Sequence, residues 1–440
     1  MPLFVLIFFS LLTVSSFAEA THLYTLEGLG HLGGGGSRAS AINNHDAVTG
    51  ESETGSGDVE AFLWTPGAGM KSLGTLGGTM SRAYDINDAG LVVGESSDTN
   101  ESVTAFVWSE SFGMQSLPVP TDSMYSAALA VNENGVIAGT VEDARGVHAV
   151  LWSGTNMIML HRLPGSGVVQ PLDVNGQGDV VGHINLGAEE EAASLAFYFK
   201  GGVQASNLVE FRLVSALSGS AAVAVNRNGR AAGYVMLDST QVRAFMYDPA
   251  KGLELLENRG AIFSSAADIN HDGWAVGSFV ASYSSDESAC LWRKGRTFDL
   301  NEITLSRGDW WLVQGTGIND GGRIAGNGVH ADEHEAFILR PVANARFDAW
   351  PDVLIYVREL DDESQDELFR LIEVKVPVDI EVKRVLFYED DRMLGAVEEA
   401  PYEWGWQGAR GRNYQFHATV VDSSGRSMHS RRIPLEDAPP

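Results

Sequence analysis

The chain has 440 residues, of which 44% are hydrophobic, and carries a formal net charge of −28. This hydrophobic content suffices for a large core, and the negative charge argues against nucleic acid or an anionic membrane surface as a partner. With a single cysteine, Cys290, the chain has no internal disulfide, so its folded state must depend on its core.

The first 20 residues have the features of an export signal. Leu3–Val14 is apolar but short for a membrane span, and Ala18-Glu19-Ala20 fits the small-x-small cleavage rule. The alternative is an uncleaved anchor. The sequence therefore predicts a signal peptide over residues 1–20. We expect a secreted or extracellular mature protein, with the periplasm as the alternative compartment, and no membrane insertion after cleavage.

A short motif recurs seven times along the chain, most clearly at Asp85–Gly94, DINDAGLVVG. Asn87 suits the first position of a four-residue turn because its side chain bonds nearby main chain. Gly90 suits the last because it accepts positive φ. Apolar runs on both sides predict a hairpin. The first copy has Asp46 in place of this glycine, and a second glycine follows four residues later in every copy. The other turn asparagines are Asn43, Asn132, Asn175, Asn226, Asn270 and Asn319.

Each hairpin is followed by a four-residue apolar run. Runs this short predict strands that are buried on both faces, and Cys290 is expected to be a small buried hydrophobe in one of them. The turn asparagines lie 43 to 51 residues apart, a period typical of propeller blades. The sequence thus predicts an all-β fold with a seven-bladed propeller over residues 21–341. The runs are Ala61–Trp64, Ala105–Trp108, Ala149–Trp152, Ala196–Phe199, Ala244–Tyr247, Ala289–Trp292 and Ala336–Leu339.

The N-terminal segment of the mature chain is expected to close the ring. The last repeat ends near Leu339 without a fourth strand, whereas Tyr24–Leu32 resembles the fourth strand of an earlier repeat, Met70–Leu76. We predict that residues 24–32 complete the last blade, because a ring closed by both chain ends has no exposed sheet edges.

The combined pattern LGTLGG-x-x-S-x-A-x-x-IN-x-x-G-x-VVG followed by AFLW covers residues 24–340 and resembles the bacterial HAF extracellular repeat family. No copy reads His-Ala-Phe, although Val147-His148-Ala149-Val150 comes close. The resemblance implies an exported repeat protein of β-propeller type and assigns no functional residue.

The repeat stops after Pro341. We expect a linker over residues 342–350 and a small β-sandwich over residues 351–440, with strands near Val353–Val357, Phe369–Val376, Val385–Tyr388 and Tyr414–Val421. These segments resemble bacterial Ig-like modules, in which a tyrosine such as Tyr414 is common. Trp404 and Trp406 are expected in the core of this module.

Two segments have metal-ligating residue types. Asp268–Gly273 matches the start of a calcium loop, but the twelfth position is Phe279 where a glutamate is needed. His330, Asp332, Glu333 and His334 crowd one loop of the last repeat and are ligand types for transition metals, but their spacing matches no known scaffold. The sequence therefore assigns neither a metal nor a cofactor.

Trp310 and Trp311 follow Asp309 on a connection between blades. Exposed aromatic rings in such loops suit sugars or peptides, although the pair could equally begin a strand and pack in the core. The candidate ligand-binding residues are therefore Trp310, Trp311, His330, Asp332 and His334. Catalytic residues stay unknown, because the chain lacks a Gly-x-Ser-x-Gly elbow and Gly33–Gly36 leads into a strand.

Two hypotheses for function follow. Segments that vary between repeats, such as 51–60, 96–104 and 279–288, are expected on one propeller face, and variable loops on a rigid scaffold suit binding. The first hypothesis is an exported binding or scaffolding protein that presents acidic loops to an extracellular glycan or protein. The alternative is an enzyme that cleaves glycans or peptides, which would need paired carboxylates of raised pKa, about 5–9 Å apart, at the tunnel mouth.

Overall fold

The computed structural model describes residues 24–160, 168–186, 193–201, 210–213, 219–305, 307–341, 354–359, 367–375, 382–390, 392–399, 402–409, 414–422, 427–429 and 433–435. The predicted signal peptide and the linker over 342–350 lie outside this part of the chain. Two compact units are present, of which one is residues 24–341 and the other contains residues 342–440. Among the described residues, no helix is long and apolar enough to cross a membrane.

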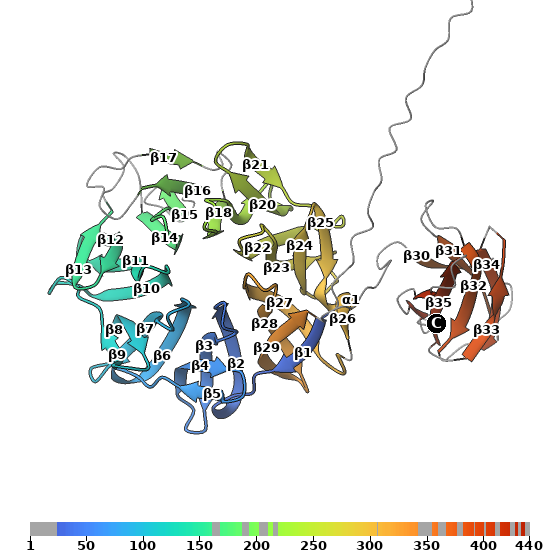
Figure 1. The fold of residues 1–440 in the computed structure, drawn as a ribbon, viewed down its shortest axis with the longest axis horizontal. Coiled ribbons are helices and arrows are strands. Elements are labelled where there is room, and N and C mark those ends of the chain that lie inside the picture. The colour runs from blue at the N-terminus through green and yellow to red at the C-terminus, as the bar shows by residue number, and fades with distance from the viewer. Residues whose placement is uncertain are drawn as a thin grey trace, which may run out of the picture. The chain divides into compact units, whose positions relative to one another are not determined.

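The first unit is a β-propeller whose antiparallel four-stranded blades surround a common axis (Figure 1). Blade 1 is β2 (Gly33–Ile42), β3 (Val48–Thr54), β4 (Val59–Thr65) and β5 (Gly69–Ser72); blade 2 is β6 (Gly77–Ile86), β7 (Val92–Asp98), β8 (Val103–Ser109) and β9 (Gly113–Ser116); blade 3 is β10 (Tyr125–Val131), β11 (Val136–Asp143), β12 (Gly146–Ser153) and β13 (Asn156–Met159); blade 4 is β14 (Val168–Val174), β15 (Val180–Leu186), β16 (Ala193–Lys200) and β17 (Glu210–Leu213); blade 5 is β18 (Ser220–Val225), β19 (Ala231–Met236), β20 (Val242–Asp248) and β21 (Gly252–Leu255); blade 6 is β22 (Phe263–Ile269), β23 (Ala275–Val280), β24 (Ser288–Arg293) and β25 (Arg296–Asp299); blade 7 is β27 (Trp311–Ile318), β28 (Ile324–His330), β29 (Glu333–Pro341) and β1 (Tyr24–Gly28).

The predicted closure by the mature N-terminus is confirmed. Strand β1 pairs antiparallel with β29, with Leu26 opposite Leu339. On its other side β1 pairs with the short strand β26 (Thr304–Leu305), which follows the one-turn helix α1 (Leu300–Ile303). The two ends of the repeat region are therefore held in one sheet.

The predicted hairpin turns are present at the inner end of every blade. In the clearest copy, the main-chain N–H of Gly90 donates to the carbonyl of Asn87 over 3.0 Å, and Gly90 has φ +76°. In the first copy, Asp46 adopts φ +64° at the same position. An aspartate can occupy this left-handed conformation, but at some cost in strain.

Every innermost strand contains a bulge three residues before the turn asparagine. In blade 3 the register skips Leu129, so that Ala128 pairs with Gly139 and Ala130 with Ala138. A bulge leaves one residue unpaired and redirects its side chain. The skipped residues of the seven blades are Ser40, Tyr84, Leu129, Leu172, Val223, Ala267 and Thr316.

The second glycine of each repeat is required by this bulge. A Cβ on Gly139 would lie 2.1 Å from the carbonyl oxygen of Ala127, and on Gly94 it would lie 1.9 Å from that of Arg82. These distances are too short for any side chain, because the neighbouring atom is main chain. The same close approach occurs at Gly50, Gly182, Gly233, Gly277 and Gly326.

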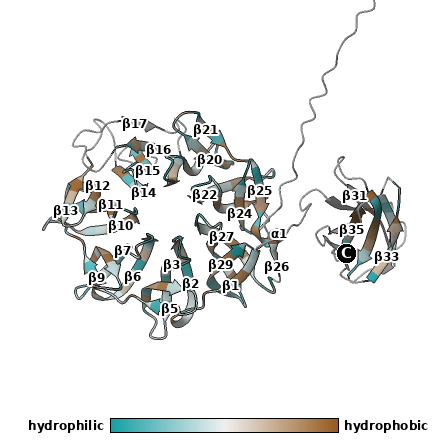
Figure 2. Cartoon of the chain, viewed as in Figure 1, coloured by the Kyte–Doolittle hydropathy of each residue, from teal (hydrophilic) through white to brown (hydrophobic). Residues whose placement is uncertain are grey.

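The hydrophobic core of the propeller lies between neighbouring blades. Phe62 and Trp64 of blade 1, for example, pack in one cluster with Ala336 and Ile338 of blade 7. Figure 2 shows hydrophobic stretches along the strands of the ring. The apolar four-residue runs are buried as predicted, apart from partly exposed Leu63 and Val107, and Cys290 is fully buried.

The segments predicted as variable loops are shorter than expected. Strand β3 continues to Thr54 and β4 begins at Val59, so much of segment 51–60 is paired strand. The linkers between blades do meet these turns, since Leu32 bridges Thr54 and Leu76 bridges Asp98. The loop surface at this end of the propeller is therefore smaller than the sequence suggested.

The second unit contains two small sheets, of which one has three strands and the other five. Ile372, Val374 and Trp406 of the first pack against Phe387 and Phe416 of the second, so the unit is a β-sandwich. Trp404 and Tyr414 belong to the same core; its likeness to Ig modules stays a prediction. The strands are β30 (Leu354–Glu359), β31 (Glu367–Lys375), β32 (Val382–Glu389), β33 (Arg392–Val397), β34 (Tyr402–Ala409), β35 (Tyr414–Asp422), β36 (Ser427–His429) and β37 (Ile433–Leu435).

Candidate functional site

The turn asparagines form a closed ring around the propeller axis. In each blade the Nδ2 group of the buried asparagine donates to the main-chain carbonyl of the corresponding asparagine in the next blade, over 2.8–3.2 Å. The Oδ1 atom accepts the main-chain N–H four residues later in its own turn, as in Asn132 with Val136 at 3.0 Å. Each asparagine therefore fixes its own turn and joins it to the next blade.

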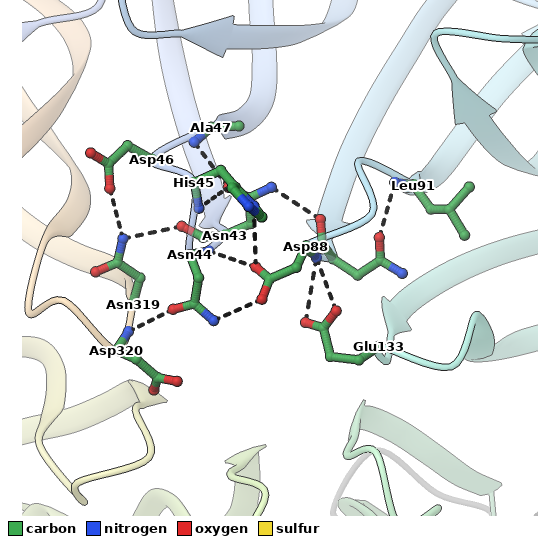
Figure 3. Close-up of polar contacts among 11 residues, drawn as sticks. Asn43, Asn44, His45, Asp46, Ala47, Asp88, Leu91, Glu133, Asn319 and Asp320 are labelled. Atoms are coloured by element: carbon green, nitrogen blue, oxygen red, sulfur yellow. Dashed lines mark hydrogen bonds and ion pairs between the residues drawn. The ribbon is translucent and has the colours of Figure 1, made fainter.

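A second set of contacts surrounds this ring where the turns reach the surface (Figure 3). Asn44 donates to Asp88 over 2.9 Å, and the main-chain N–H of Asp88 donates to Glu133 over 3.1 Å. The main-chain N–H of Asp320 donates to Asn44 over 2.8 Å, which connects the last blade to the first. This end of the propeller is consequently rigid and rich in carboxylates.

Three aspartates face the axis from blades 2, 4 and 6. Asp85 accepts the main-chain N–H of Ile86 with one oxygen and that of Val131, in the next blade, with the other, both at 2.7 Å. Asp173 and Asp268 bridge to the next blades in the same way, over 2.6–2.7 Å. The corresponding residues of the other blades are small: Ala41, Ala130, Ala224 and Gly317.

Burial raises the pKa of all three carboxyl groups. The pKa of Asp85 rises to about 7 and that of Asp268 to about 6. The pKa of Asp173 is also well above its usual range, through burial and then repulsion from the Asp85 charge. The main-chain N–H donors oppose the rise by stabilising the charged form, but burial is the larger effect.

These aspartates border a central cavity of about 300 Å³, lined by residues from all seven innermost strands. The bulge residues described above supply most of its remaining wall, and it is apolar on the side of Leu129, Leu172 and Val223. The alternative hypothesis called for raised-pKa carboxylates in a central pocket, and such carboxylates are present. All six of their oxygen atoms, however, already accept main-chain hydrogen bonds.

Blades 1 to 3 carry a charged network next to this cavity. Arg82 donates to Glu51 over 2.7 Å and lies 3.5 Å from Glu95, which is 4% exposed. Tyr125 donates to the other oxygen of Glu95. Burial, followed by the neighbouring Glu95 charge, raises the pKa of Tyr84, which lines the cavity. The network thus holds Tyr84 and Tyr125 as neutral hydrogen-bond donors.

Of the residues predicted from sequence, the structure brings Trp310 and His330 together. Their rings stack with centroids 4.7 Å apart. The Nδ1 atom of His330 lies 3.1 Å from Glu335, and its Nε2 atom lies 3.3 Å from Asp309. Trp310 is only 7% exposed and packs edge-on against Phe337, so its ring belongs to the core and not to an exposed platform.

The other three predicted residues lie apart from this pair. Trp311 begins β27, is partly exposed and donates to the carbonyl of Glu287 over 2.8 Å. Asp332 is exposed in the turn between β28 and β29, with φ +67°. His334 lines a cavity of about 190 Å³ between blades 7 and 1, together with Arg38 and Glu53. The assignment of these residues to ligand binding stays a prediction.

A cavity of about 540 Å³ between blades 5 and 6 was not predicted from the sequence. It lies at the end of the blades that carries the asparagine turns, and its wall combines Arg230, Met246, Trp274, Trp292 and Arg293. We call it the blade 5–6 groove. A signal was available, because Arg230 and Trp274 occupy the variable position four residues after the turn asparagine. Within the described residues, no group of three or more His, Cys, Asp or Glu side chains could hold a metal ion.

Comparison with known proteins gives the fold alone. No family model matches the chain, and no curated protein matches it. Among solved structures, a streptogramin B lyase has 11% identity and a TM-score of 0.48, covering 73% of this chain and 98% of its own. The acylaminoacyl peptidase of Pyrococcus horikoshii has 9% identity and a TM-score of 0.44, covering 79% and 59%. The sialidase of Trypanosoma rangeli, bound to 2,3-difluorosialic acid, has 7% identity and a TM-score of 0.39, covering 83% and 85%. Likeness this distant says nothing about what the chain binds or catalyses.

Proposed function

We propose that the chain is an exported binding protein whose propeller holds an extracellular glycan in a surface cavity between blades. The observation that carries this proposal is the bonding of the central carboxylates. Asp85, Asp173 and Asp268 use every oxygen atom to join neighbouring blades. An acid or base in a glycosidase must instead reach the substrate through a carboxyl oxygen.

The surface cavities support binding for a complementary reason. The blade 5–6 groove, at about 540 Å³, falls in the size range of small-ligand sites. Its wall contains two tryptophans, apolar Met246 and Leu256, and charged groups of both signs. Such a mixture offers an apolar surface for a sugar ring and several hydrogen-bonding groups for its substituents.

The test is a glycan array probed with the mature chain, residues 21–440, followed by incubation of each bound glycan with the protein and mass spectrometry of the mixture. We expect saturable binding to a subset of glycans and no cleaved product. Cleavage that depends on Asp85, Asp173 or Asp268 would support the enzyme hypothesis instead. A flat response to every glycan by folded protein would contradict the proposal.

A further inference from the structure

The blade 5–6 groove has positive charge that its own wall compensates only in part. The guanidinium group of Arg293 lies 4.0 Å from the centroid of the Trp274 ring, and its Nε atom is buried with no hydrogen-bond partner in the described structure. Burial lowers the pKa of Arg293, although the nearby Tyr24 hydroxyl and Asp272 act in the opposite direction. An acceptor placed beside this guanidinium would satisfy a buried donor.

Arg230 provides a second guanidinium from the neighbouring blade. A Cβ on Gly273 would lie 2.6 Å from its Nη1 atom, so the Arg230 side chain reaches across to the turn of blade 6. Its Nε atom lies 3.7 Å from Asp248, too far for a hydrogen bond, and has no hydrogen-bond partner among the described residues. The groove therefore has underused guanidinium donors on both of its walls.

The carboxylates of the groove do not neutralise these donors equally. Both oxygens of Glu257 are occupied by main-chain N–H groups, of Arg259 and Thr297. Glu254 and Asp272 lie exposed at its edge. Together with the net charge of −28, these two edge carboxylates would repel a multiply charged anion more strongly than a singly charged one.

We propose that the blade 5–6 groove binds an acidic saccharide through a single carboxylate, held by Arg293 and Arg230, with the sugar ring against Met246, Leu256 and the exposed part of Trp274. A planar guanidinium matches a carboxylate with two parallel hydrogen bonds. This inference rests on the proposed glycan-binding function and specifies its ligand as a uronic acid.

The probes are trigalacturonic acid and its methyl ester, which differ only in the charge of the carboxyl groups, titrated calorimetrically into the mature chain at pH 7. We expect the acid to bind at least tenfold more tightly than the ester, with an affinity that falls as salt is added. Equal affinity for acid and ester, or no binding of the acid by folded protein, would overturn the assignment.

The variants are Arg293→Gln and Arg230→Gln, with Lys251→Gln as the matched control, because Lys251 is an exposed cation of blade 5 outside the groove. We expect each arginine variant to lose at least tenfold in affinity for the acid while its affinity for the ester and its melting curve stay unchanged. Arg293→Lys, which keeps the charge without the planar fork, should lie in between. Unchanged affinity for the acid in Arg293→Gln would refute the site.

A competition arm separates carboxylate from phosphate. Galactose 6-phosphate should displace trigalacturonate only at higher concentration than galacturonate does, and the reverse order would overturn the carboxylate assignment. If the glycan array instead yields neutral glycans whose binding is unaffected by Arg293→Gln, the binding function stands and this inference fails. If the array yields no glycan at all, both fail.

Discussion

The asparagine ring and the blade 5–6 groove are built from the same turn but use different parts of the chain. In every blade, the asparagine Oδ1 accepts the main-chain N–H of the residue four positions later, at 3.0 Å. Any residue except proline supplies that N–H, so the side chain at this position can vary freely. It is Ala47, Leu91, Val136, Asp179, Arg230, Trp274 or Arg323. The repeat thus fixes its architecture through main-chain contacts and leaves side chains available for surface chemistry.

The largest effect is expected from Gly139→Ala, which tests whether main-chain contact sets the architecture. The added Cβ would lie 2.1 Å from the Ala127 carbonyl oxygen, so the bulge must break, at a cost of about 3 kcal/mol or more. Gly135→Ala is the matched control: Gly135 has φ +75° with its nearest atom 3.6 Å away, and the cost should be about 1 kcal/mol. Urea unfolding measures both, and equal destabilisation would contradict the explanation.

A smaller loss is expected from Asn132→Ala, which removes a link of the asparagine ring. The substitution deletes the bond to the Asn175 carbonyl and leaves the N–H groups of Asn134 and Val136 without their acceptor. Unsatisfied buried groups of this kind should cost about 2–3 kcal/mol in total.

Asn134→Ala, in the same turn, loses one exposed bond to Gly176 and should cost less than about 1 kcal/mol. If the two variants unfold at the same urea concentration, the ring does not contribute as described.

Much of this architecture could be predicted from the sequence because its determinants are local. The Asn87–Gly90 spacing specifies the turn, and the ring closure followed from the missing fourth strand after Leu339. The aspartates were harder to interpret, since the role of Asp85 depends on Val131 in another blade, 46 residues away. Their occurrence in alternate repeats was a visible signal that the sequence reasoning did not use.

The predicted ligand residues show where such reasoning ends. Trp310 and His330 do meet, but whether the Trp310 ring is exposed depends on packing against Phe337 and Gly28, which sequence spacing does not reveal. The blade 5–6 groove combines side chains from four strands and a turn of two blades, with Arg230 and Arg293 far apart in the chain. Only the three-dimensional packing brings them to one cavity.

The central aspartates predict an unusual pH dependence. Their folded-state pKa values, about 7 for Asp85 and about 6 for Asp268, lie above the ordinary unfolded value. The folded state therefore binds more protons, and stability from these groups should fall as pH rises from about 4 to about 7. Each unit of pKa difference corresponds to about 1.4 kcal/mol. Urea unfolding of the wild type at pH 5, 6, 7 and 8 should show this decline.

Asp85→Asn sharpens the same test, because an amide does not titrate. The variant should lose stability less steeply between pH 5 and pH 8 than the wild type does. Glu110→Gln, which removes a 77% exposed carboxylate, should keep the wild-type slope. A wild-type stability that rises through this window, or a slope that Asp85→Asn leaves unchanged, would show that the central carboxyl groups are charged in the folded state at pH 5.

The smallest effect concerns Asp46, the one turn residue that replaces glycine at the junction of the first and last blades. Asp46 adopts φ +64°, a conformation that costs about 1 kcal/mol without glycine. Its carboxylate accepts from Asn319 over 3.0 Å and pairs with Arg323 over 2.8 Å. Because the pair is partly exposed, its contribution should also be at most about 1 kcal/mol.

These two terms can be separated with a pair of variants. Asp46→Gly loses the contacts but relieves the strain, so its urea midpoint should lie close to that of the wild type. Asp46→Ala loses the contacts and keeps the strain, and should be less stable than Asp46→Gly by about 1 kcal/mol. If the alanine variant were the more stable, the strain at this turn would not oppose the contacts, and Asp46 would need no explanation beyond tolerance of its turn.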